Sequence, residues 1–228
     1  MSKLICGDAF EVLKTIPNNS IDLILTDPPY NLVNESNFTN MDRTGSDFGS
    51  WDVDFSQVGW LPDAERVLKK NGSLLIFNTF RNISPIIKIA EELKFVYKDP
   101  VRWIKTNPMP RNKERRYISD FETAFWFTKK GGKWTFNRQT DPYERPEFKC
   151  GLTSGKNRIH PTQKPLPLLE YLLKIHSNEG DVVLDPFMGS GSAGVASINL
   201  GREFIGIELD EEYFNKASEW IGRVEGKI

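Results

Sequence analysis

The feature that most constrains the fold of this chain is the alternation of short apolar runs with amphipathic stretches. Short apolar runs predict strands buried in a sheet, and apolar residues spaced at i, i+3 and i+4 predict helices that cover it. The expected strands are 4–6, 21–26, 73–78, 95–105, 123–128, 181–184 and 204–209. The expected helices are 9–14, 62–69, 84–93, 166–176, 192–200 and 211–221. The pattern predicts an α/β fold with helices on both faces of a seven-stranded sheet.

Glycines mark the expected turns between these elements. Strand 123–128 is followed by Lys129-Lys130-Gly131-Gly132 and then by residues 133–136, which predicts a hairpin with a glycine turn. Asn71-Gly72 and Gly201 are expected to end the helices before them, because glycine readily adopts the left-handed C-terminal conformation. We therefore expect a mixed sheet with one antiparallel hairpin strand.

Charge is unevenly distributed along the chain. The formal net charge is −1, yet residues 102–164 hold 15 Lys and Arg against 6 Asp and Glu. A basic segment between acidic flanks is typical of a nucleic-acid-binding face, and a solvated loop region would explain the charge equally well.

Cysteine content and hydropathy exclude several classes of protein. Cys6 and Cys150 are the two cysteines, and neither lies in a CxxC motif or a Cys/His cluster. We therefore expect both to be structural, with neither a disulfide framework nor a metal site. No apolar stretch approaches the roughly 20 residues that a membrane span needs. These observations predict a cytoplasmic protein without a membrane partner.

A glycine-rich segment predicts a cofactor site. Residues 182–194 read VVLDPFMGSGSAG, an apolar strand that ends in Asp185 and leads into GxGxxG spacing at a helix start. Glycines let a ligand approach the backbone, and the helix start presents free N–H groups. Glu208 ends the next strand, near the spacing of roughly 20 residues at which an acid meets ribose hydroxyls. The order favours a nucleoside-bearing cofactor over a tight turn without a ligand.

A second strand ends in the tetrapeptide Asp27-Pro28-Pro29-Tyr30. The prolines stiffen the exit from the strand and leave carbonyl groups free to accept hydrogen bonds. An aromatic ring, a carboxylate and a free carbonyl together can hold a planar ring that carries an amino group. In that arrangement Tyr30 stacks on the ring while Asp27 and the Pro28 carbonyl accept its N–H protons. A proline-rich turn with an incidental tyrosine is the alternative.

Three motifs together resemble a known family. DPPY at 27–30, HPTQKP at 160–165 and DPFMGSGS at 185–192 resemble the β-class (permuted) DNA adenine-N6 amino-methyltransferases, in a short form without a large target-recognition domain. The resemblance implies a Rossmann-like, S-adenosylmethionine-dependent methyltransferase fold, with one catalytic domain over residues 1–228. It also implies methyl transfer to N6 of a flipped-out adenine in double-stranded DNA, at a short or relaxed target site.

The resemblance implies roles for individual residues as well. The catalytic residues would be Asp27, Pro28, Pro29 and Tyr30. The cofactor would contact Asp8, Asp27, Thr162, Lys164, Asp185, Phe187, Gly189, Ser190, Gly191 and Glu208, with Lys164 facing its carboxylate. His160 would cap the turn before the helix at Leu166 rather than act in catalysis.

Target recognition would fall to loops, because about two dozen residues between Phe136 and His160 leave no room for a recognition domain. The candidate DNA-contacting or mobile segments are 31–59, 106–119 and 137–159. Candidate DNA-binding residues are Arg111, Lys113, Arg115 and Arg116. A homodimer that shares recognition and a cognate restriction endonuclease are the partners to consider besides DNA.

Other activities remain open at this point. Cytosine-N4 methyltransferases more often carry serine at the position of Asp27, and RNA and protein glutamine methyltransferases use related tetrapeptides. A NAD-linked oxidoreductase would explain GxGxxG and Glu208 but would give DPPY and HPTQKP no role. A catalytically silent DNA-binding partner would not need an intact cofactor loop.

Overall fold

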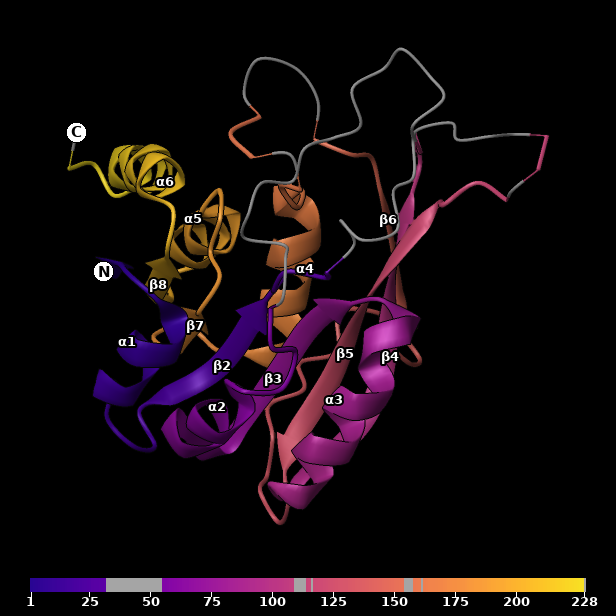
Figure 1. Ribbon diagram of the computed structural model, residues 1–228. Helices are drawn as coiled ribbons and strands as arrows, with labels where there is room; N and C mark the ends of the chain where they lie inside the picture. Colours follow the sequence, from indigo (N-terminus) through magenta and orange to yellow (C-terminus); the bar gives the residue numbers. More distant parts are fainter. Residues whose placement is uncertain (32–54, 109–113, 116, 154–157, 161, 228) are drawn as a thin grey trace.

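The computed structural model describes residues 1–31, 55–108, 114–115, 117–153, 158–160 and 162–227 (Figure 1). Strands and helices alternate over most of this length, as the sequence predicts. Their order is β1 (Ser2–Cys6), α1 (Ala9–Thr15), β2 (Ile21–Thr26), α2 (Leu61–Val67), β3 (Leu68–Asn78), α3 (Phe80–Glu92), β4 (Phe95–Lys105), β5 (Phe121–Lys129), β6 (Glu147–Cys150), α4 (Leu166–His176), β7 (Val182–Asp185), α5 (Ser192–Asn199), β8 (Glu203–Glu208) and α6 (Glu211–Val224).

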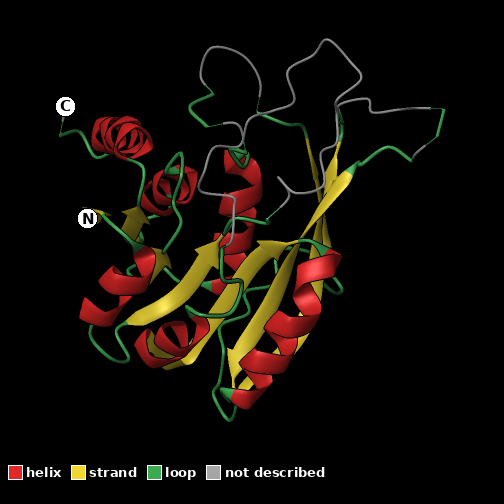
Figure 2. Cartoon of the chain, in the orientation of Figure 1, coloured by secondary structure: helices red, strands yellow, loops and turns green. Residues whose placement is uncertain are grey.

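These strands form one twisted sheet in the order β1-β8-β7-β2-β3-β5-β4-β6 (Figure 2). It has eight strands within the described residues, because β6 joins the seven expected ones by pairing in parallel with β4. β5 runs antiparallel to both of its neighbours, β3 and β4, and every other neighbouring pair is parallel. The sheet is therefore mixed, with one reversed strand.

The expected hairpin partner of β5 was wrong. β5 already pairs along both edges, with β3 on one side and β4 on the other, so residues 133–136 find no free edge. They continue instead as irregular chain, in which Lys133 N donates to Asn71 Oδ1 at 2.9 Å. Phe136 stacks on Trp126 with ring centroids 5.5 Å apart. The antiparallel hairpin of the sheet is β4 with β5.

Asn71-Gly72 also has a different role from the expected one. α2 ends at Val67 and β3 starts at once, so the dipeptide lies inside a strand. Leu68 pairs with Ile21 whereas Ser73 pairs with Leu23, which leaves extra residues on β3 as a bulge. The prediction for Gly201 was confirmed, because it follows α5 with a φ of 73°.

Helices cover both faces of the sheet (Figure 1), and an apolar layer lies between the helices and the sheet on each face. One layer contains buried residues of α1, α2 and α3, and the other contains those of α4, α5 and α6. Successive residues of β2 point to opposite faces of the sheet, so Ile24 packs in the first layer whereas Leu23 and Leu25 pack in the second. Helices thus cover both faces, as expected.

The layers also locate a crevice in the sheet. β2 and β7 are parallel neighbours, but α2 after β2 packs on one face and α5 after β7 packs on the other. Connections that diverge in this way open a crevice at the carboxyl ends of the two strands, where α/β proteins bind ligands. Asp27 follows β2 and Asp185 ends β7, so both carboxylates lie at this point.

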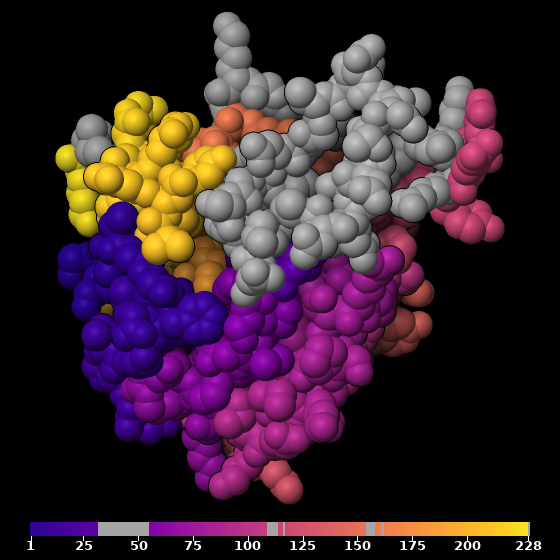
Figure 3. All heavy atoms as spheres, viewed as in Figure 1, coloured from indigo at the N-terminus to yellow at the C-terminus, as the bar shows by residue number. Residues whose placement is uncertain are grey.

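The first strand and the segment after the last helix meet on one side of the molecule, where indigo and yellow atoms adjoin in Figure 3. Ser2 donates from its backbone N–H and its hydroxyl to the Glu225 carboxylate, both at 2.6 Å. Among the helices of the described residues, none combines the length and the apolar content needed to cross a membrane.

Candidate active site

A cavity of about 170 Å³ lies at the carboxyl ends of the central parallel strands. Its wall includes Asp8 after β1, Asp27 and Pro29 after β2, Asp185 at the end of β7, and Glu208 at the end of β8. The turn before α4 closes another side. Nine of the ten residues expected to contact the cofactor line this cavity: Asp8, Asp27, Thr162, Lys164, Asp185, Phe187, Gly189, Ser190 and Glu208.

The tenth residue, Gly191, faces the protein interior instead. A Cβ atom there would lie 3.0 Å from both Ala217 and Ile221 of α6, and the φ of 75° is left-handed. Gly194 allows still closer packing, because its Cβ would lie 2.6 Å from Ile221 and from Phe204. At Gly189 the nearest atom would be in the His160 ring at 3.8 Å, so this glycine leaves space open beside the cavity. Gly189 therefore leaves space for a ligand, whereas Gly191 and Gly194 allow close packing of neighbouring side chains.

Two carboxylates at the strand ends are fixed by hydrogen bonds. Asp185 Oδ1 accepts from the Thr26 hydroxyl at 2.7 Å and from Phe187 N at 3.1 Å. Burial nevertheless raises the pKa of Asp185 to about 7. Glu208 accepts from Gly189 N and Asp210 N, at 2.8 Å and 2.9 Å, and burial raises its pKa as well. Both are polar groups available to a ligand in a partly apolar cavity.

Asp8 and His160 have structural roles as well as cavity positions. Asp8 caps α1 by accepting from Phe10 N at 2.9 Å. His160 is buried, and its ring packs edge-on to Tyr213 with centroids 4.3 Å apart. Its Nδ1 lies 2.9 Å from the Thr162 hydroxyl, within the turn that precedes α4. Burial, with the positive charge of Lys164, lowers the pKa of His160 to about 4, so the ring is neutral at pH 7.

The tetrapeptide 27–30 leaves β2 at the rim of the cavity. The Tyr30 hydroxyl donates to Asp27 Oδ1 at 2.5 Å, and the Lys164 ammonium pairs with Asp27 Oδ2. Burial raises the pKa of Asp27, and Lys164 opposes that rise. Both carboxylate oxygens are thus occupied by donors within the protein. Lys164, expected to face a cofactor carboxylate, contacts the carboxylates of Asp27 and Glu122 here.

Three side-chain amides hold the next part of the tetrapeptide. Gln57 Nε2 donates to the Pro29 carbonyl at 2.7 Å, and Asn82 Nδ2 donates to the Tyr30 carbonyl at 3.0 Å. Asn78 joins them, since it donates to Gln57 Oε1 and accepts from Asn82 Nδ2, both at 2.9 Å. Among the hydrogen bonds of the described residues, none reaches the Pro28 carbonyl. The amides therefore fix the backbone that follows Pro28.

The sequence did not single out these amides or Glu122. Asn78 had a usable signal, because it is a polar residue at the carboxyl end of an apolar strand, as are Asp27 and Asp185. Gln57 and Asn82 are scattered in a loop and on a helix face and show no such signal.

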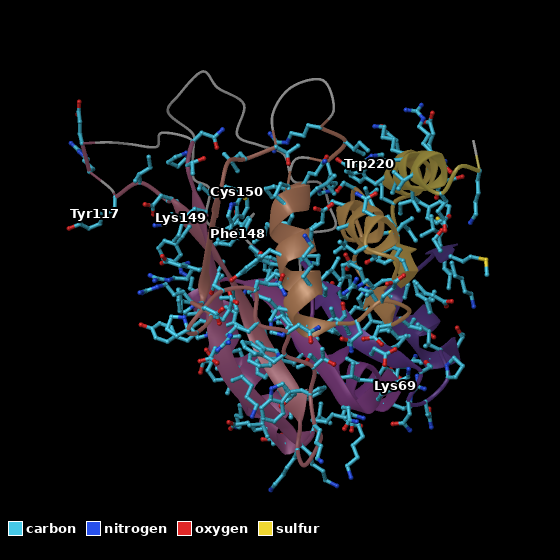
Figure 4. The ribbon with its side chains drawn as sticks, turned by 180° about the vertical axis from the view of Figure 1, so that it is seen from behind. Lys69, Tyr117, Phe148, Lys149, Cys150 and Trp220 are labelled. Atoms are coloured by element: carbon cyan, nitrogen blue, oxygen red, sulfur yellow. The ribbon has the colours of Figure 1, made fainter. Side chains whose placement is uncertain are left out.

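The described residues place only part of the expected DNA interface. Arg115 is exposed, whereas Arg111, Lys113 and Arg116 lie outside the described residues, as does most of segment 31–59. Tyr117, next to them, is fully exposed and projects away from the sheet (Figure 4).

Segment 137–159 divides at β6. Residues 137–146 lead into the amino end of this parallel strand, and Asn137 N donates to the Ile175 carbonyl near the end of α4, at 2.8 Å. Only residues after Cys150 leave β6 at the edge of the sheet where the cavity lies. The expected loop 137–159 thus contains a strand, and a parallel strand sends its two flanking loops to opposite ends of the sheet. Contact of this segment with DNA stays a prediction.

No group of three or more His, Cys, Asp and Glu side chains that suits a metal ion occurs in the part of the chain that the structure describes.

Comparison with known proteins identifies relatives of this chain. Residues 21–219 match the family described as DNA methylase (N6_N4_Mtase). The Type II methyltransferase M.HinfI of Haemophilus influenzae is 37% identical over 249 residues, which cover 99% of this chain and 69% of that protein. These matches extend well beyond the three motifs.

Solved structures agree with the sequence matches. The M1.HpyAVI complex with S-adenosylmethionine has a TM-score of 0.78 and 40% identity, and the match covers 96% of this chain and 98% of that one. The cytosine-N4-specific PvuII DNA methyltransferase shares the fold, with a TM-score of 0.75 at 18% identity over 99% of this chain and 92% of that one.

Proposed function

Because the chain belongs to the DNA methylase family and is a site-specific DNA methyltransferase, we propose that its acceptor is the N6 amino group of adenine. The amino group of a stacked base is inaccessible to such a site, so the adenine must leave the duplex, which costs a few kcal/mol. The methyl donor is S-adenosylmethionine, and the fold is that of the S-adenosylmethionine-dependent methyltransferases.

The side chains that line the cavity suit this cofactor. It combines a carboxylate at each of four strand ends with the ring of Phe187 and the open space at Gly189. We propose that Glu208 accepts hydrogen bonds from the ribose hydroxyls and that Asp185 faces the amino acid end. When bound, S-adenosylmethionine supplies a methyl group activated by its attachment to a positively charged sulfur.

The observation that supports the acceptor most directly is the arrangement of the tetrapeptide. Asp27 and the free Pro28 carbonyl are two acceptors on one rigid segment, and Tyr30 offers a ring beside them. Two acceptors can align both protons of an exocyclic amino group, which turns the nitrogen lone pair toward the methyl group. The new C–N bond would form as the C–S bond breaks, and we propose that Asp27 accepts the proton that the nitrogen then loses.

Adenine is favoured over cytosine by the carboxylate in the tetrapeptide. Cytosine-N4 enzymes resemble this chain in fold but more often carry serine at the position of Asp27. The tetrapeptide also precedes the glycine loop in the chain, which supports the permuted β-class order. We further propose the short form, with recognition by the segments 31–59, 106–119 and 137–159. A homodimer, a partner endonuclease and a cytoplasmic location stay predictions.

The test is methyl transfer from labelled S-adenosylmethionine to DNA, followed by separation of the methylated nucleosides. We expect N6-methyladenine from the wild-type protein, and N4-methylcytosine in its place would refute the assignment. RNA and protein acceptors assayed in parallel address the related enzyme classes. Asp27→Ala should bind the cofactor yet transfer almost no methyl groups, and a largely active Asp27→Ala protein would contradict the mechanism.

A further inference from the structure

A chain of alternating charges extends from the tetrapeptide into the sheet. The Lys164 ammonium lies between the carboxylates of Asp27 and Glu122, with its nitrogen 3.1 Å from Glu122 Oε2. Lys105 pairs with the other oxygen of Glu122 at 2.7 Å. The side chain of Lys164 is 7% exposed and that of Lys105 is 12% exposed. The chain of charges is therefore a largely enclosed network.

Glu122 reaches the site because β5 is reversed in the sheet. Strands β2, β3 and β7 bring their carboxyl ends to the cavity, whereas antiparallel β5 brings its amino end there. Glu122 is the second residue of β5, and it pairs across the sheet with Trp103 near the end of β4. Lys105 ends β4 at the same edge. Residues far apart in the sequence thus share one position beside Asp27.

Glu122 and Lys164 keep their charges at neutral pH. Burial favours the neutral forms, but Lys164 and Lys105 together outweigh it and hold the pKa of Glu122 at about 2. Burial would likewise lower the pKa of Lys164, and the two carboxylates reverse this and raise it. Glu122 is thus a charged partner for Lys164 that does not depend on Asp27.

Such a second partner matters because Asp27 has no free oxygen. Tyr30 donates to Oδ1 and Lys164 donates to Oδ2, so an arriving amino group must displace one donor. A lysine that lost Asp27 in an enclosed site would be left uncompensated, which is costly. Because Glu122 is already within contact distance, Lys164 keeps an ion pair when it releases Asp27.

We propose that Glu122 is a positioning residue for methyl transfer. It holds Lys164 beside Asp27, and it remains the ion-pair partner of Lys164 when the acceptor's amino group takes the place of Lys164 on Asp27. This inference rests on the proposed function of the same site. It gives Lys164 a task at the acceptor rather than at the cofactor carboxylate. Lys105 then fixes Glu122 from the other side.

The test compares Glu122→Gln with Lys164→Met in single-turnover methylation of target DNA between about pH 5 and pH 9. Asp27 faces Tyr30, Lys164, Glu122 and Asp185, of which Lys164 lowers its pKa and Glu122 raises it. The acidic limb of the rate profile should therefore move to higher pH in Lys164→Met and to lower pH in Glu122→Gln. We expect Glu122→Gln to lower the rate roughly tenfold or more and Glu122→Asp to restore part of it.

Cofactor titration by calorimetry supplies a readout independent of transfer. We expect the Kd for S-adenosylmethionine to stay within about threefold of wild type in both variants, which also shows that they fold. The matched control is Glu65→Gln, because Glu65 pairs at 3.0 Å with Lys129, whose side chain is also 12% exposed, at the other end of β5. This control should keep wild-type rates and pH dependence.

Two results would overturn the inference. One is a wild-type rate profile in Glu122→Gln, and the other is loss of cofactor affinity in Lys164→Met that matches its loss of rate, which would assign Lys164 to the cofactor. Failure of the proposed function is separate, because the wild-type protein itself would then fail to form N6-methyladenine.

Discussion

Tyr30 combines two contributions that two substitutions can separate. Its hydroxyl donates to Asp27 Oδ1 at 2.5 Å, and its ring is proposed to stack on the flipped base. Tyr30→Phe removes the hydroxyl and keeps the ring, whereas Tyr30→Ala removes both. The hydrogen bond to the carboxylate also opposes the rise in the pKa of Asp27, so both variants should shift the acidic limb of the rate profile to higher pH.

The expected magnitudes follow from the contacts. A hydrogen bond to a charged group contributes about 1.5 to 3 kcal/mol. The other oxygen of Asp27 keeps a donor in the variant, Lys164 before the acceptor arrives and the amino group afterwards, so the lower value applies and Tyr30→Phe should lose roughly tenfold in rate. Stacking on an aromatic side chain adds about 1 to 3 kcal/mol per base. Tyr30→Ala should therefore lose a further factor of roughly 5 to 150 in kcat/KM for DNA.

Single-turnover methylation measures the loss in rate, and 2-aminopurine fluorescence at the target base measures the fraction flipped. Cofactor affinity from calorimetry should stay near the wild-type value in both variants. The reasoning fails if Tyr30→Phe methylates at the wild-type rate, because the hydrogen bond from the hydroxyl to Asp27 would then not contribute to transfer. It also fails if Tyr30→Ala is no worse than Tyr30→Phe, or if cofactor binding collapses together with turnover.

Three further predictions address stability and DNA binding. The raised pKa of Asp185, about 7 in the folded protein, means that this group contributes a loss of stability on the order of 4 kcal/mol as pH rises from about 4 to about 7 without cofactor. Relative to the wild type, Asp185→Asn should therefore gain stability by about that amount between the two ends of this range, as denaturant unfolding of both proteins would show. Gly194→Ala should destabilise the protein by about 1 to 3 kcal/mol, because its Cβ would overlap Ile221 and Phe204, while the exposed control Asn199→Ala should change little in the same unfolding measurement. Replacing Arg115 and Arg116 should flatten the salt dependence of DNA binding by roughly 0.9 log units for each phosphate that these side chains neutralise, and an unchanged slope would remove both from the interface.

Sequence patterns predicted the elements that bury apolar residues on a regular period. β6 escaped because its four residues, EFKC, pair along one edge only and include Glu147 and Lys149, so no apolar run marks it. α3 begins at Phe80 rather than at residue 84, because Pro85 resembles a helix start although the helix has already begun. Pairing partners were harder still, as β5 shows: a glycine turn after a strand indicates a hairpin only if an edge is free.

The candidate site was predictable where its chemistry is contiguous. DPPY and DPFMGSGS each place several functional groups on one short segment at a strand end, so their side chains meet whatever the rest of the fold does. The contact between Lys164 and Glu122 depends on the reversed direction of β5, which no local pattern states. The same holds for Gln57 and Asn82, which reach the carbonyl groups of the tetrapeptide from a loop and from a helix.

The reversal of β5 has a consequence for how proteins of this architecture can diversify. A connection between parallel strands must return from the carboxyl end of one strand to the amino end of the next, at the opposite end of the sheet. Its length is therefore constrained by the helix that makes the crossing. The connection from β4 to β5 starts and finishes at the same end of the sheet, beside the cavity. Residues can be added there without moving any strand, at an entropic cost that grows only slowly with length. This connection is where a new recognition element could be grafted onto an unchanged catalytic framework.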